Sequence, residues 1–96
     1  MRLEWVSPGT LRLPSTRRDV DLTKLADQYR AFGSSVSGMP PILVTRCRDG
    51  EMMINDGVTR ATRITRYAPG KLVPVDVQEE RPNLDVTHLP RVQDAR

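Results

Sequence analysis

Eight prolines divide this 96-residue chain into short segments, and their spacing is what most constrains the fold. Proline fixes φ and lacks a backbone N–H, so it interrupts helices and the interior of sheets. The length suits one domain, near the lower end of what folds alone. Hydrophobic residues make up 38% of the chain, with one Trp, two Tyr and one Phe, so the core must be small and mostly aliphatic. We therefore expect short helices and strands with rigid connections.

Two segments have the periodicity of amphipathic helices. The first is predicted to start from a cap at Asp19 or Asp21 and to end at Gly33. Its expected buried face is made of apolar residues at helical spacing: Leu22, Leu25, Ala26, Tyr29 and Phe32. The second is predicted from about Val58 to Ala68, where Pro69-Gly70 stops it. Its inward stripe is expected to contain Val58, Ala61, Ile64, Thr65 and Ala68.

A β-hairpin is the clearest strand prediction. Ile42–Arg46 and Met52–Ile54 flank Asp49-Gly50, and Asp-Gly between two apolar runs favours a tight hairpin turn. A later strand is predicted over Leu72–Val77. Pro74 within it indicates either an edge position or the start of the strand, because proline cannot donate to a sheet.

The chain ends are less strongly patterned. Met1–Val6 is predicted to be a first strand, with Leu3, Trp5 and Val6 as candidates for burial. The composition becomes polar after Gln78, so we expect a folded domain over residues 1–78 and a C-terminal tail over 79–96. The tail could dock or stay mobile. Its candidate docking residues are Leu84, Val86, Leu89 and Val92.

The segment Ile54–Arg63 has the pattern of an anion-binding turn. Gly57 lets backbone N–H groups approach a ligand, the following helix start offers unpaired donors, and Arg60 adds a two-pronged charge. Arg63 shares a helix face with Arg60 and is expected to widen the basic surface. Asp56 is expected to cap the helix, with metal binding or a catalytic general-base role as alternatives.

The charge distribution also fits an anionic ligand. The net charge is +3, from 15 Lys and Arg against 12 Asp and Glu, and Lys24 and Lys71 are the only lysines. Arginines concentrate in residues 1–18 and 46–66. This focus is typical of proteins that bind a nucleotide or nucleic acid, although a GC-rich genome would also produce many arginines.

Several functional classes find no support in the sequence. Cys47 is the only cysteine and His88 the only histidine, so neither an internal disulfide nor a zinc site is expected. No apolar run approaches membrane-spanning length, and the N-terminus has no signal-peptide pattern. We therefore expect a cytoplasmic protein that uses no membrane and no protein-bound metal.

Four motifs in order resemble the ParB/sulfiredoxin fold. They are Leu13-Pro14 followed by Arg17-Arg18, the run Gly38–Val44, the G-x-x-R turn Asp56–Arg60, and Lys71–Val75. The resemblance covers roughly residues 6–77 and includes ParB N-terminal domains and the ParB-like nuclease superfamily. It implies a small α+β domain, a mixed sheet with two main helices.

The resemblance also implies a ligand and its contacts. Relatives bind a nucleoside triphosphate, such as ATP or CTP with Mg²⁺, on the G-x-x-R turn. This places Gly57, Thr59 and Arg60 at a phosphate, with Arg17 or Arg18 as a second contact. Val58 departs from the family, because it stands where sulfiredoxin has its nucleophile and where ParB has an acidic residue.

Three functions remain as alternatives. The first is a ParB-like module that binds a nucleotide or nucleic-acid phosphate. The second is a small phosphodiester-cleaving or phosphoryl-transferring enzyme, a ParB-like nuclease or toxin, with Asp56 as its catalytic carboxylate. The third is an adaptor that binds a protein partner, and a homodimer is compatible with each of the three.

Overall fold

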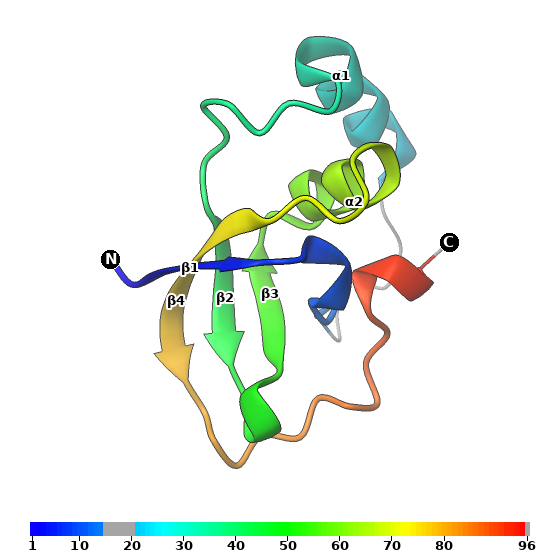
Figure 1. Ribbon diagram of the computed structural model, residues 1–96. Helices are drawn as coiled ribbons and strands as arrows, with labels where there is room; N and C mark the ends of the chain where they lie inside the picture. Colours follow the sequence, from blue (N-terminus) through cyan, green and yellow to red (C-terminus); the bar gives the residue numbers. More distant parts are fainter. Residues whose placement is uncertain (15–20, 96) are drawn as a thin grey trace.

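A four-stranded mixed sheet and two helices form the protein in a computed structural model, which describes residues 1–14 and 21–95 (Figure 1). The helices are α1 (Leu22–Phe32) and α2 (Val58–Tyr67). The strands are β1 (Leu3–Val6), β2 (Ile42–Arg46), β3 (Met52–Asp56) and β4 (Val73–Glu80). This arrangement confirms the predicted α+β class, with a mixed sheet and two main helices.

The sheet has the strand order β1-β4-β2-β3. β2 and β3 pair antiparallel, and their connection has positive φ at Asp49 (62°) and Gly50 (77°), so the predicted Asp-Gly hairpin is confirmed. β4 lies inside the sheet, antiparallel to β1 and parallel to β2. Its pairing with β2 begins at Val75, so Pro74 stands at the start of the strand and interrupts no hydrogen bond to β2.

The hydrophobic core lies between one face of the sheet and α2. Alternate residues of β4, Val73, Val75 and Val77, are buried there, as the period of two in a strand requires. The other core side chains come from β2, β3, α2 and the segment after β1: Ile42, Val44, Met52, Ile54, Val58, Ala61, Ile64, Leu11 and Leu13. α2, the segment after β1 and Val92 near the C-terminus thus together cover this face of the sheet.

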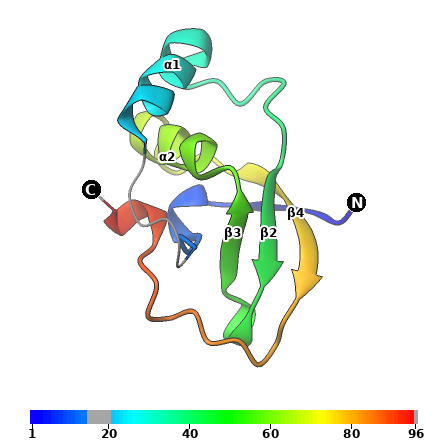
Figure 2. The same cartoon turned by 180° about the vertical axis from the view of Figure 1, so that it is seen from behind.

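The C-terminal residues pack onto this unit (Figures 1 and 2). The Leu13 N–H donates to the Pro90 carbonyl and the Val92 N–H donates to the Leu11 carbonyl, both at 2.9 Å. Val92 joins the main core, while Val86 and Leu89 form a second buried cluster with Cys47. β4 thus runs two residues past position 78, and the residues named here pack on the folded unit.

The predicted buried face of α1 is largely wrong. Asp21 caps the helix by accepting from the Lys24 N–H at 3.1 Å, and Gly33 ends it with φ 59°. Of the expected apolar face, however, only Leu25 is buried; Phe32 remains 56% exposed. The reason is that α1 packs on α2 and lies away from the sheet, so only a narrow stripe is covered (Figure 2).

The predicted first strand is present as β1, but the predicted burial of Leu3 and Trp5 is wrong. Trp5 is 62% exposed and Leu3 is also exposed, while Val6 is partly buried. In the register of β1 with β4, Val6 lies opposite the buried Val73, and Trp5 lies opposite Pro74. Successive residues of a strand point to opposite faces, so Leu3 and Trp5 face the side of the sheet that α2 does not cover.

Candidate anion-binding site

Gly57 forms the turn between β3 and α2. It is the N-cap residue of α2 with φ 113°, a conformation that side chains with a Cβ rarely adopt. A Cβ here would lie 2.9 Å from Nη2 of Arg60 and 3.2 Å from Cγ2 of Ile42. Among the described residues, no side chain caps α2 at this end. The first N–H groups of a helix have no partner within it, so the turn offers free backbone donors.

Arg60 lies back over Gly57, with its side chain 19% exposed. Nη2 donates to the Pro41 carbonyl at 3.3 Å and lies 3.9 Å from Oδ2 of Asp56. Nε is buried and has no hydrogen-bond partner among the described residues. The guanidinium therefore lies beside the helix start, and the described residues accept from only part of its donor groups.

Asp56 does not cap α2, contrary to the expectation. It is the last residue of β3, and because Gly57 occupies the N-cap position, the Asp56 side chain stands one residue too early. Its carboxylate is 71% exposed, next to the Arg60 guanidinium. Thr59, expected at a phosphate, is largely buried in the first turn of α2.

A cavity of about 160 Å³ lies at the N-terminus of α2. It brings four of the predicted site residues together: Asp56, Gly57, Thr59 and Arg60. α1 adds Lys24 and Gln28, which are one helical turn apart and so share a face. Sequence reasoning missed Lys24, because only the packing of α1 on α2 brings this residue to the cavity at the Gly57 turn.

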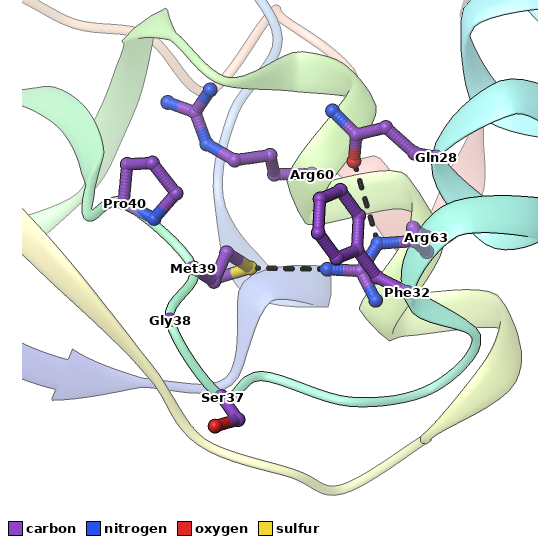
Figure 3. Close-up of a pocket in the computed structure, with 8 residues that line it drawn as sticks. All are labelled: Gln28, Phe32, Ser37, Gly38, Met39, Pro40, Arg60 and Arg63. Atoms are coloured by element: carbon purple, nitrogen blue, oxygen red, sulfur yellow. Dashed lines mark hydrogen bonds between the residues drawn. The ribbon is translucent and has the colours of Figure 1, made fainter.

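A second cavity, of about 220 Å³, lies between the two helices and the segment 37–40 (Figure 3). Its lining residues are Gln28, Phe32, Ser37, Gly38, Met39, Pro40, Arg60 and Arg63. Gln28 and Arg60 line both cavities, so the two lie next to each other on either side of these side chains.

Arg63 does not widen the basic surface as expected, because the residue is only 1% exposed. It faces α1, and Nη1 donates to the carbonyl groups of Gly33 and Ser35, both at 2.8 Å. These carbonyls stand just after α1, where partial negative charge from the helix dipole favours a cation. Arg63 therefore fastens the end of α1 to α2, and burial lowers the pKa of its guanidinium.

The remaining predicted contacts, Arg17 and Arg18, lie outside the described residues. Within residues 1–14 and 21–95, no three His, Cys, Asp or Glu side chains gather as a metal site would require. None of the helices in this part of the chain has the length and apolar character to cross a bilayer. Comparison with protein-family models, curated proteins and solved structures found no match.

Proposed function

We propose that this protein binds the phosphate groups of a nucleotide or nucleic acid at the N-terminus of α2. One observation carries the proposal: a single cavity joins an uncapped helix start with Lys24 from α1 and Arg60 from α2. Backbone N–H groups and the helix dipole favour an anion at such an end. Two cations from separate elements then add charge on either side of it.

The order of motifs that resembles ParB/sulfiredoxin-type domains supports a nucleoside triphosphate as the ligand, with ATP and CTP as the first candidates. Such a ligand would bring its own Mg²⁺, because this ion binds mainly through phosphates, waters and one or two carboxylates. The exposed carboxylate of Asp56 lies at the same cavity and could coordinate this Mg²⁺ ion. Val92 packs in the main core, and Val86 and Leu89 pack around Cys47, so this part of the C-terminal segment would move with the binding domain.

Thermal unfolding with a nucleotide panel tests this proposal. ATP, CTP and pyrophosphate, each with and without Mg²⁺, are compared at fixed concentration. A ligand at 100 times its Kd stabilises the native state by about 2.7 kcal/mol, which raises Tm by roughly 10 °C in a domain of this size. Absence of a shift with every ligand at about 1 mM would exclude binding tighter than about 1 mM and refute the proposal.

The variants Arg60→Ala and Lys24→Ala should reduce the ligand-induced shift. Arg66→Ala is the matched control, because Arg66 is exposed in the last turn of the same helix and lines neither cavity. Each variant is compared with and without ligand, so that a change in its own stability cancels. An equal reduction of the ligand-induced shift in Arg66→Ala would mean that binding depends on the overall charge of the protein and not on the cavity.

The position of Asp56 favours an enzyme as the second candidate function. Its carboxylate is exposed at the cavity where the phosphate is proposed. Asp56→Asn keeps the size of the side chain and removes the base. Cleavage of a labelled RNA or DNA, or phosphoryl transfer from ATP, that is present in the wild type and lost in Asp56→Asn would establish the enzyme. If both proteins bind nucleotide and neither turns it over, the function is that of a binding module and not of an enzyme.

A further inference from the structure

The buried guanidinium of Arg63 is incompletely satisfied on the side that faces the second cavity. Nε donates to Oε1 of Gln28 at 3.3 Å, and Nη1 donates to Gly33 and Ser35. Nη2 carries two N–H groups, and its one partner among the described residues is Sδ of Met39, at 3.5 Å. A thioether is a weak acceptor. Figure 3 shows Gln28 and Met39 approaching Arg63 from different sides of the cavity.

The charge of Arg63 also lacks a counter-ion in the described part of the chain. None of the salt bridges there involves this residue. Its surroundings are neutral dipoles and the ring of Phe32, whose centroid lies 5.5 Å from Cζ. A buried charge is costly unless it is paired, and arginine does not lose its proton in proteins. An anion in the adjoining cavity would supply both the missing acceptor and the missing charge.

The shape and lining of the cavity restrict which anion fits. Phe32, Met39 and Pro40 supply apolar walls, and the volume is about 220 Å³. A dry cavity of about 150 Å³ already holds benzene, so a ring with a small substituent fits here. Arg60 also lines this cavity, but its guanidinium already lies 3.9 Å from the Asp56 carboxylate. A phosphate dianion would therefore bring more negative charge than the unpaired charge of Arg63 balances. A carboxylate carries one negative charge and suits a guanidinium.

We propose that the cavity between α1, α2 and residues 37–40 binds the carboxylate of a small molecule with an apolar or aromatic body. The carboxylate accepts from Nη2 of Arg63, and the apolar body packs against Phe32, Met39 and Pro40. The carboxylate is proposed to bind at Arg63 and the phosphate at the Gly57 turn, and Gln28 and Arg60 line both cavities. Phe32 lines only the first cavity and Lys24 only the second, so variants at these two residues distinguish failure of one proposal from failure of the other.

Benzoate is the probe, and benzamide is its neutral control of the same shape. Binding to the full chain is followed by two-dimensional NMR titration, with the Arg63 side-chain resonance as a local reporter. Benzoate should bind in the millimolar range and at least about tenfold more tightly than benzamide, which corresponds to about 1.4 kcal/mol. Equal binding of the two compounds would overturn the proposal, because the charge of Arg63 would then play no part.

Two variants locate the site without removing the helix contacts of Arg63. Phe32→Ala removes a wall at a position that is 56% exposed, so the fold should tolerate it, and benzoate affinity should fall several-fold. Met39→Leu keeps the apolar wall but removes the sulfur acceptor, and benzoate should bind at least as tightly as to the wild type. Unchanged affinity in Phe32→Ala, or displacement of benzoate by pyrophosphate, would place the anion elsewhere and overturn the proposal.

Discussion

Replacing Gly57 with alanine should destabilise the protein by about 3 kcal/mol, and the structure gives two separate reasons. The first is backbone strain, because φ is 113° and a non-glycine residue there costs on the order of 1–3 kcal/mol. The second is contact. The new Cβ would lie 3.2 Å from Cγ2 of Ile42, which is fully buried and cannot easily yield. Overpacking of this kind adds on the order of 1–3 kcal/mol.

The contact of the new Cβ with Arg60 should contribute less to the loss of stability than the contact with Ile42. Nη2 would lie 2.9 Å from the new Cβ, but it is the end of a flexible side chain and can move. That movement would take the guanidinium away from its present place over the turn. Gly57→Ala should therefore weaken ligand binding at the α2 N-terminus as well as reduce stability.

Urea unfolding at fixed pH measures the stability change, and Gly70→Ala separates its two causes. Gly70 has φ 85° but no atom within 4 Å of its added Cβ, so this variant reports strain alone. The excess loss in Gly57→Ala is then the contact contribution. If Gly57→Ala were no worse than Gly70→Ala, the close-packing argument would be refuted. If both lost less than about 0.5 kcal/mol, the strain argument would fail too.

Three further predictions concern residues away from the turn. The pKa of Glu51 is lowered, first by the hydrogen bond from Arg12 and also by Arg91. The ionised carboxylate therefore contributes its full stability above the ordinary pKa of 4.5, and this contribution is lost as the pH falls through the lower pKa of the folded state. The free energy of unfolding in urea should depend less on pH between about 5 and 2 in Glu51→Gln than in the wild type. Burial raises the pKa of the Cys47 thiol above its ordinary value, so alkylation by iodoacetamide at neutral pH should be slow in the native state and fast only after unfolding. Rapid alkylation of the native protein would contradict the burial of this thiol. Trp5 is the only tryptophan and is exposed. Its fluorescence emission in the native state should resemble that of the free amino acid and be quenched by acrylamide, whereas a blue-shifted emission would show that a partner covers this face.

Sequence patterns predicted those parts of the fold that depend on neighbouring residues. The Asp49-Gly50 hairpin, an aspartate cap at position 19 or 21 and the Gly33 end of α1 follow from local backbone preferences; all three are present, and the cap is Asp21. The turn at Gly57 and the start of α2 were predicted for the same reason. The candidate site was predicted in part, since Asp56, Gly57, Thr59 and Arg60 do line one cavity.

The errors share one cause, which is that periodicity shows where an apolar face lies but not what covers it. Leu22 and Phe32 have helical spacing, yet they are exposed because α1 rests on another helix and not on the broad surface of the sheet. Trp5 alternates correctly but faces the open side of the sheet. A hydrophobic pattern is therefore necessary for burial without being sufficient.

The sequence by itself determined the short elements, the glycine turn and an arginine one turn into the following helix, because φ preferences and residue spacing act locally. Tertiary structure decided which charges reach that turn. It brought Lys24 to the Gly57 turn and turned Arg63 inward to the end of α1, although Arg63 stands only three residues beyond Arg60. Both outcomes depend on the position of α1, a separate element whose packing no local pattern specifies.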